Sequence, residues 1–236
     1  MSSYIIDFHS HILPEIDDGS KDISMTRQML RASAEQGTDI MVATPHFYPT
    51  NTTPDHFLQQ RAAAAEQLRT LEGEELPRVL LGAEVAFFNG ISRMEQLEAL
   101  CIEGTELLLL EMPFGTWSQE TLREVERICT RGVTPVIAHL DRYLSFHKHH
   151  KAVLEELTDL PLYVQINVES LLLWRVRGAI CKLFQTNRAH LLGSDCHNVT
   201  NRPAGLAQGR EILRQKLGED ILYEIDACGS YLLGVE

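Results

Sequence analysis

The stretch YIIDFHSH, residues 4–11, joins an apolar run to two histidines that are separated by one residue. An apolar run of this length with a polar end is typical of a buried strand, and side chains on a strand alternate between its two faces. His9 and His11 are therefore expected on the same face. Further apolar runs follow, each separated from the next by a longer segment of helical character. This alternation predicts a parallel sheet with helical crossovers.

The chain contains seven such β-rich runs, and we predict one strand from each. They are Tyr4–His9, Asp39–Thr44, Arg78–Glu84, Glu106–Glu111, Thr134–His139, Leu162–Asn167 and His190–Asp195. The helices predicted between them include Ser24–Glu35, Pro54–Leu71, Gln119–Arg131, His149–Leu157 and Arg202–Leu217. Seven strand–helix units predict an α/β fold, a distorted (β/α) barrel that spans residues 1–236 as a single domain. An open doubly wound sheet is the alternative.

Composition and charge restrict the classes of function. The chain has 236 residues and a formal net charge of −12, which argues against a broad nucleic-acid interface. Five cysteines without paired short spacing argue against a disulfide framework or a cysteine zinc site, and a reducing cytoplasm is expected. The sequence starts without a basic leader and has no apolar run of membrane-spanning length, so we expect no stable membrane insertion.

Polar residues stand where the predicted strands end. In a (β/α) barrel the carboxyl ends of all strands meet on one face, and catalytic residues collect there. Imidazole nitrogens and carboxylate oxygens suit zinc, iron or manganese. Each residue alone has an ordinary explanation, such as a capping or solvated side chain, but several uncompensated carboxylates at buried strand ends would be costly. The joint pattern therefore predicts a metal site, formed from His9, His11, His46, Glu84, Glu111, His139, Asp195 and His197.

Three further histidines have a different context. His147, His149 and His150 stand in a basic, polar segment at the start of a predicted helix. We interpret them as a solvated face and not as metal ligands.

The strand-end motifs resemble those of the polymerase and histidinol phosphatase (PHP) superfamily. Within it, the chain looks like the manganese-dependent tyrosine-protein phosphatases of the CpsB and YwqE type, which are encoded beside bacterial capsule and exopolysaccharide genes. The resemblance covers almost the whole chain, and its first and last blocks are specific. The matching stretches are Ile6–Gly19, Ala43–His46, Gly82–Glu84, Leu110–Pro113, Ile137–Tyr143 and Gly193–Asn198.

The resemblance implies a distorted (β/α)7 PHP barrel that holds three divalent metal ions, with manganese favoured and iron or zinc as alternatives. The first ion would be held by His9, His11 and Asp195. Glu84 would bridge to a second ion, which Glu111 and His139 would also bind. The third ion would be bound by Asp18, His46 and His197.

Two arginines match family positions that are associated with phosphate binding, Arg142 and Arg202. The chain departs from the family near the first of them. The family usually reads His-Pro-Glu-Arg where this chain has His139-Leu140-Asp141-Arg142, and a small residue usually stands in place of Cys196. The shorter carboxylate and the missing proline leave the direction of the Arg142 side chain open.

The implied activity is hydrolysis of phosphotyrosine by metal-activated water. Clustered cations lower the pKa of water and stabilise charge on phosphate oxygens, and an arginine fork can hold two of those oxygens at once. A leaving phenolate needs little acid assistance, because the pKa of phenol is about 10. By resemblance, the substrate would be the tyrosine-rich tail of an exopolysaccharide autokinase.

Other functions stay open at this point. Cys196 and Arg202 have the Cys-x5-Arg spacing of cysteine phosphatases, but the loop lacks glycines and potential metal ligands flank the cysteine, so we expect Cys196 to fill space. An amidohydrolase-type metalloenzyme lacks support, since the usual carboxylated-lysine strand is missing and Glu84 and Glu111 are present. A histidinol-phosphate phosphatase, a nuclease and a non-catalytic metal-binding module are the remaining alternatives.

Overall fold

The structure is a computed structural model that describes residues 4–146 and 151–235. The three histidines that we interpret as a solvated face, His147, His149 and His150, lie outside the described residues.

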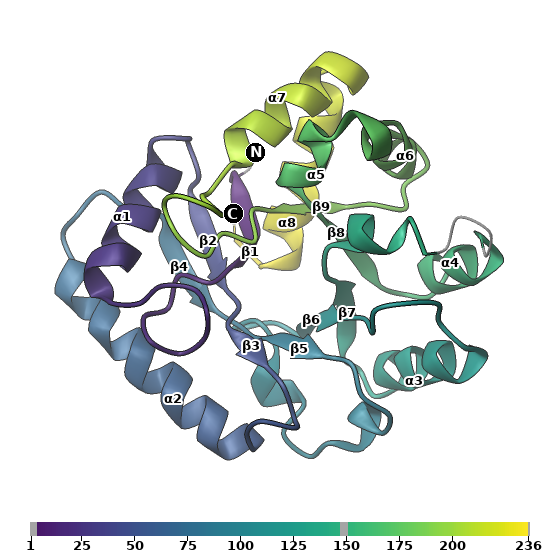
Figure 1. The fold of residues 1–236 in the computed structure, drawn as a ribbon, viewed down its shortest axis with the longest axis horizontal. Coiled ribbons are helices and arrows are strands. Elements are labelled where there is room, and N and C mark those ends of the chain that lie inside the picture. The colour runs from purple at the N-terminus through teal and green to yellow at the C-terminus, as the bar shows by residue number, and fades with distance from the viewer. Residues whose placement is uncertain (1–3, 147–150, 236) are drawn as a thin grey trace.

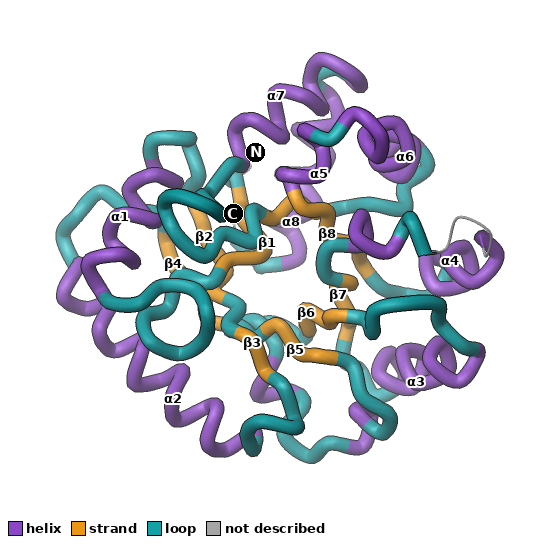
Figure 2. Tube along the Cα trace, in the orientation of Figure 1, coloured by secondary structure: helices purple, strands orange, loops and turns teal. Residues whose placement is uncertain are grey.

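Short parallel strands form the centre of the molecule, and helices surround them (Figures 1 and 2). The strands are β1 (Ile6–Ser10), β2 (Ile40–Ala43), β3 (His46–Phe47), β4 (Arg78–Leu81), β5 (Glu84–Ala86), β6 (Leu107–Glu111), β7 (Thr134–Ile137), β8 (Tyr163–Asn167) and β9 (Leu191–Gly193). They form one sheet of order β1-β2-β4 and a second of order β3-β5-β6-β7-β8-β9.

The two sheets are parts of one distorted barrel. The predicted strands Asp39–Thr44 and Arg78–Glu84 differ from the structure, because each predicted run ends early and its chain resumes as a short strand of the other sheet. Pro45, which cannot donate to a ladder, separates β2 from β3. A parallel bridge between Ser10 and Cys196 brings β1 beside the segment after β9, with the Cys196 carbonyl accepting from the His11 amide at 2.9 Å. The wall of the barrel therefore has seven strand positions, as predicted, because β2 with β3 and β4 with β5 each count as one.

The helices are α1 (Ile23–Ala34), α2 (Pro54–Gln67), α3 (Gln119–Thr130), α4 (Lys151–Thr158), α5 (Val168–Leu172), α6 (Trp174–Gln185), α7 (Leu206–Leu217) and α8 (Asp220–Leu232). Side chains that cap the first turn mark where three of them begin: Asp22 for α1, Thr53 for α2 and Ser118 for α3. Within the described ranges, no helix combines the length and apolar character needed to cross a membrane.

The C-terminal helices differ most from the prediction. The predicted helix Arg202–Leu217 begins only at Leu206. The side-chain oxygen of Asn198 accepts hydrogen bonds from the amides of Thr200 (3.0 Å), Asn201 (2.7 Å) and Arg202 (3.1 Å), so this segment is a loop. The predicted helices do not include α5, α6 or α8.

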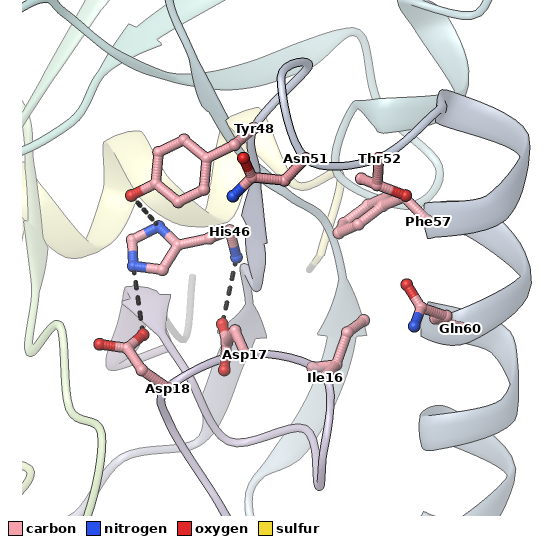
Figure 3. A pocket seen from close by; sticks show the side chains of 9 residues that line it. All are labelled: Ile16, Asp17, Asp18, His46, Tyr48, Asn51, Thr52, Phe57 and Gln60. Carbon is pink, nitrogen blue, oxygen red and sulfur yellow. Dashed lines mark hydrogen bonds and ion pairs between the residues drawn. The ribbon is translucent and has the colours of Figure 1, made fainter.

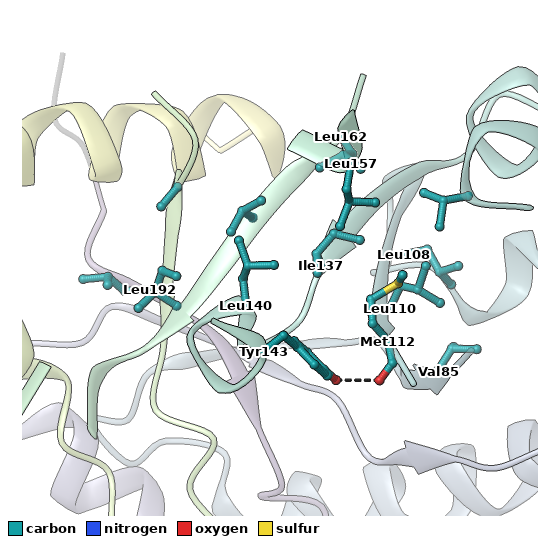
Figure 4. Packing of buried hydrophobic residues seen from close by; sticks show 14 of the residues in the cluster. Val85, Leu108, Leu110, Met112, Ile137, Leu140, Tyr143, Leu157, Leu162 and Leu192 are labelled. Carbon is teal, nitrogen blue, oxygen red and sulfur yellow. Dashed lines mark hydrogen bonds between the residues drawn. The ribbon is translucent and has the colours of Figure 1, made fainter. Parts of the chain in front are cut away.

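The apolar core fixes the loops that carry the polar strand ends. Figure 4 shows Leu110, Ile137 and Tyr143 among the buried residues of one apolar cluster. Tyr143 is fully buried, and its hydroxyl donates to the carbonyl of Met112 at 2.6 Å. This bond ties the loop after β7 to the loop after β6, so the polar residues on the two loops are held relative to each other.

Candidate metal centre

All nine predicted metal ligands lie where the predicted strands end: in or after β1, β6, β7 and β9, or at the start of the short strands β3 and β5 that follow β2 and β4. β1 carries His9, with His11 and Asp18 in the following loop, and β3, β5 and β6 carry His46, Glu84 and Glu111. His139 follows β7, while Asp195 and His197 follow β9. The structure brings these residues to one face of the barrel, as the strand ends predict.

Glu84 lies at the centre of the group and is almost completely buried. Its Oε2 atom is 2.8 Å from His46 Nδ1, 3.2 Å from His9 Nε2 and 3.3 Å from His11 Nε2. Its other oxygen, Oε1, is 2.8 Å from His139 Nε2. One carboxylate therefore contacts four imidazole rings, an arrangement suited to a bridging ligand.

The potential ligands form four overlapping groups in which one donor atom of each member lies within 4.8 Å of the others. One group contains the three residues that the sequence assigns to a third ion, Asp18, His46 and His197, together with His11. The other groups divide the remaining residues differently from the prediction. They are His9, His11 and Glu84; His9, His139 and Asp195; and His46, Glu84 and Glu111.

The arrangement of donor atoms fits bound cations. His197 Nδ1 is 2.9 Å from the backbone carbonyl of Asp195, which places the proton on Nδ1. The Nε2 lone pair then faces Asp18 Oδ1 at 3.3 Å, and the buried Nε2 atom makes no hydrogen bond within the described chain. A lone pair directed at a carboxylate oxygen is unfavourable unless a cation lies between them. The Nε2 atoms of His9 and His11 lie 3.2 Å apart, within reach of a shared cation.

Charges on the surrounding residues shift the pKa values in this site. Burial would raise the pKa of Glu84, but the charge of His9 and hydrogen bonds from the other imidazoles outweigh burial and hold the pKa well below its usual value. Asp195 behaves in the same way, and its pKa is also lowered. Burial and the charges of His11 and Arg202 lower the pKa of His197 to about 4. Glu84 and Asp195 are therefore ionised and His197 is neutral at pH 7, the forms that bind metal. Burial would lower the pKa of His9 and of His11, but the neighbouring carboxylates outweigh burial and raise both, so each imidazolium must lose a proton when a metal ion binds.

A second layer of polar residues orients the potential ligands. His11 Nδ1 is 2.7 Å from Asp17 Oδ2, and His9 Nδ1 is 3.2 Å from Gln165 Oε1. The side-chain Nδ2 of Asn167 donates to Asp195 Oδ2 at 2.9 Å. The sequence prediction missed these supporting roles. The sequence does contain a sign of two of these residues. Gln165 and Asn167 stand two residues apart in an otherwise apolar strand, so their side chains share one face.

Both predicted phosphate-binding arginines lie at the rim of this cluster. Arg142 belongs to a 3₁₀ turn after β7 and Arg202 to the loop after β9, and both pair with Asp195, Arg202 at 2.8 Å. About a third of each side chain is exposed, 34% for Arg142 and 37% for Arg202. His139 and Asp195 adopt left-handed backbone angles, with φ of 33° and 52°, a conformation that concentrates at functional sites.

The departure from the family pattern at Asp141 has a structural consequence. The Asp141 carboxylate is buried and accepts hydrogen bonds from the backbone N–H of Asn167 at 2.9 Å and from the Ser170 hydroxyl at 2.6 Å. The shorter carboxylate thus ties the turn after β7 to the end of β8. Arg142, the next residue, is directed toward Asp195 and the cluster.

Cys196 lacks the features of a nucleophile. It is fully buried, and burial together with the charge of Asp7 raises the pKa of its thiol well above the usual range. Most backbone amides that would have to cradle a phosphate have other partners: those of Thr200, Asn201 and Arg202 donate to the Asn198 side chain, and those of His197 and Asn198 donate to the Arg202 carbonyl. These observations argue against the cysteine-phosphatase alternative.

Known proteins share both the sequence pattern and the fold. The sequence model of the family described as "Capsular polysaccharide synthesis, CpsB/CapC" matches residues 5–229. Tyrosine-protein phosphatase CpsB of Streptococcus pneumoniae is 30% identical over 230 residues, covering 91% of each chain. Tyrosine-protein phosphatase YwqE of Bacillus subtilis is 27% identical over 234 residues, covering 97% of this chain and 91% of that protein.

The fold also matches a solved structure from a study of YwqE from Bacillus subtilis and CpsB from Streptococcus pneumoniae, which are described as metal-dependent tyrosine phosphatases. The TM-score is 0.83 at 24% identity, with 97% of this chain and 94% of that chain covered. A phosphotriesterase homology protein from Escherichia coli matches with a TM-score of 0.60 at 13% identity, covering 98% and 99%, and shows the fold alone. The predicted barrel is confirmed, and the chain belongs to the capsular polysaccharide synthesis CpsB/CapC family.

Proposed function

We propose that this chain is a metal-dependent phosphatase that hydrolyses phosphotyrosine in proteins. The observation that carries the proposal is the convergence of Glu84, four imidazoles and two arginines at one face of the barrel. Family membership supports the same reaction, because the relatives in Streptococcus pneumoniae and Bacillus subtilis are named as tyrosine-protein phosphatases.

The proposed site holds three divalent ions, with Mn²⁺ as the favoured metal. The proposed ligands are His9, His11, Asp18, His46, Glu84, Glu111, His139, Asp195 and His197. When bound, the ions supply Lewis acidity, which lowers the pKa of water and stabilises charge on phosphate oxygens. The protein contributes a fixed set of nitrogen and oxygen donors, which Asp17, Gln165 and Asn167 orient from behind.

Arg142 and Arg202 are the proposed phosphate-binding residues. Each guanidinium reaches Asp195 and is partly exposed, so each can turn toward a phosphate above the cluster. Two positive side chains approaching from different loops suit a phosphate that carries two negative charges, and the planar fork can donate to two oxygens. The arginines would then hold the phosphate in place and offset its charge.

The biological setting is part of the proposal. The description of the family, capsular polysaccharide synthesis, supports a role in capsule or exopolysaccharide synthesis. The proposed substrate is the tyrosine-rich tail of a bacterial autokinase. A cytoplasmic location is supported by the cysteines, all five of which are free. We also propose that the chain acts as a single domain, because segments from both halves of the sequence close the barrel.

Metal removal and a comparison of rates on different substrates test the proposed function. Dialysis against a chelator should abolish hydrolysis of a phosphotyrosine peptide, and Mn²⁺ should restore it. The rate with the peptide should exceed the rates with phosphoserine peptide and histidinol phosphate. Full activity in a sample verified to be metal-free would exclude the mechanism, whereas preference for histidinol phosphate would identify a small-molecule phosphatase. Hydrolysis of an amide substrate alone would favour the amidohydrolase alternative.

A further inference from the structure

A pocket of about 410 Å³ opens beside the proposed metal site, between α2 and the loops that follow β1 and β3. Figure 3 shows Ile16, Asn51 and Gln60 arranged around it, with Asp18 and His46 at one side. The site predictions from the sequence include Asp18 and His46 but leave the rest of this pocket without a role. Its wall is formed by Ile16, Asp17, Asp18, His46, Tyr48, Asn51, Thr52, Phe57 and Gln60.

The pocket is continuous with the proposed metal site. Asp18 and His46 line the pocket and also belong to one of the potential metal-binding groups. Tyr48 stands between the two regions, with its hydroxyl 3.2 Å from His46 Nδ1 and its ring stacked on the imidazole at 5.0 Å. A polypeptide whose phosphate occupies the metal site would therefore have neighbouring residues within reach of the pocket.

The chemistry of the wall suits an uncharged side chain with an apolar body and a polar tip. Ile16 and Phe57 supply apolar surface, while Asn51, Thr52 and Gln60 supply neutral hydrogen-bonding groups. No lysine or arginine lines the pocket among the described residues. Asp17 offers little to a ligand, because its oxygens accept from His11 and from the amides of Gly19 and His46. An acidic side chain would thus find no positive partner on this wall.

We infer that this pocket is a specificity subsite for a residue that flanks the phosphotyrosine in the substrate polypeptide. It accepts a side chain with an apolar body and a hydrogen-bonding tip, of which tyrosine is the clearest example. Apolar contact with Ile16 and Phe57 and hydrogen bonds to the neutral amides select it over a small or an acidic residue. The inference rests on the proposed function and adds to it a basis for choosing among phosphotyrosine sites.

Two adjacent glutamines on α2 provide a variant and its matched control. Gln59 and Gln60 are both exposed, but Gln60 lines the pocket and Gln59 does not. Gln60→Trp fills the pocket from its open side, and Gln59→Trp adds the same bulk elsewhere on the helix. Because both positions are exposed, both variants should fold, and thermal unfolding curves check this. Gln60→Ala provides a second pocket variant that removes the amide without adding volume.

The test compares kcat/KM of the Mn²⁺-loaded enzymes on peptides with Tyr, Ala or Glu on both sides of the phosphotyrosine. The parent and Gln59→Trp should prefer the Tyr peptide over the Ala peptide by roughly three- to tenfold, the contribution of about one neutral hydrogen bond. The Glu peptide should be no better than the Ala peptide. Gln60→Trp should lose the preference, Gln60→Ala should reduce it, and neither should change kcat/KM for 4-nitrophenyl phosphate. Binding of non-hydrolysable phosphonate peptides should show the same ratios.

Three results would overturn the inference. They are equal rates of the parent on the Tyr and Ala peptides, an undiminished preference in Gln60→Trp, and an equal loss by Gln60→Trp on peptide and 4-nitrophenyl phosphate. The third result would mean that the pocket holds the phosphotyrosine ring itself. Failure of the parent to hydrolyse any phosphotyrosine peptide would instead overturn the proposed function.

Discussion

The Asp17 carboxylate lies 2.7 Å from Nδ1 of His11, while the opposite ring nitrogen of His11 faces Glu84 at 3.3 Å. Burial would raise the pKa of Asp17, but the hydrogen bond and charge of His11 outweigh it, and the pKa lies below its ordinary value. An ionised Asp17 holds the proton on Nδ1, so the proton that His11 loses when a metal ion binds comes from Nε2.

Asp17→Asn should therefore weaken metal binding without removing a ligand. We expect Mn²⁺ affinity to fall about 10- to 100-fold, the usual effect of losing a residue that orients a ligand. Calorimetric titration of the metal-free protein measures it, with Asp55→Asn at an exposed position of α2 as the control. A dissociation constant within twofold of the parent would show that Asp17 does not support His11.

Gly193 provides a steric test of the same site. A Cβ atom at this position would lie 2.6 Å from both His9 Cβ and Gln165 Nε2, closer than such atoms approach in proteins. Gly193→Ala should therefore displace His9, lower the melting temperature and reduce the amount of bound Mn²⁺. Gly178→Ala is the matched control, because no atom lies within 4 Å of its added methyl and alanine is favoured by about 0.5–1 kcal/mol within a helix. Equal metal content in both variants would contradict the prediction.

Cys196 should be dispensable for the reaction. Its buried thiol has a raised pKa and stays protonated at neutral pH, so iodoacetamide should fail to modify it in the folded protein at pH 8. Cys196→Ala should keep substantial activity, with at most a modest loss of stability from the small cavity. Mass spectrometry locates the modified cysteines, and steady-state kinetics measures the rate. A variant that binds its metals but has no turnover would revive the cysteine mechanism.

The two arginines should act on the substrate and not on the metals. Arg142→Ala and Arg202→Ala should each reduce kcat/KM about 10- to more than 100-fold, because a charge-assisted hydrogen bond contributes about 1.5–3 kcal/mol. Lysine at either position should restore activity only partly, since it keeps the charge and loses the fork. Metal analysis of the same samples should match the parent. Kinetic parameters within about twofold of the parent in both alanine variants would show that these arginines are solvent-facing residues without a role in phosphate binding.

The barrel was predictable because each strand carries its own local signal. Runs such as Thr134–His139 are apolar for several residues and end in one ligand-type side chain, so the parallel order of strands and the clustering of their ends followed from the sequence. The resemblance added Asp18, which stands in a loop with an ordinary turn composition. The role of its neighbour Asp17 depends on how that loop folds back over His11, and local composition does not encode that path.

The missed features depend on contacts between distant segments. Glycine disfavours a helix, yet Gly229 lies inside α8. The position needs glycine because a Cβ atom there would lie 2.8 Å from the ring of Phe8 on β1. Gly178 likewise interrupts the helical pattern of α6. The second predicted strand ends at Thr44, but after Pro45 the chain resumes as β3 in the other sheet, where His46 pairs with Glu84. Propensity describes single segments, whereas tertiary packing decides these cases.

The closure of the barrel between β1 and the segment after β9 sets the order in which the protein can assemble its site. The Ser194 amide donates to Asp7 Oδ1 at 2.8 Å, across 187 positions of sequence. As the ribosome synthesises the chain from its N-terminus, His9 and His11 emerge early, but Asp195 and His197 emerge only after most of the protein has been made. Contacts of such long range form slowly, and a nascent or truncated chain has only part of the ligand set. We therefore expect complete metal loading only after translation is finished, and we expect an unfinished chain to be inactive.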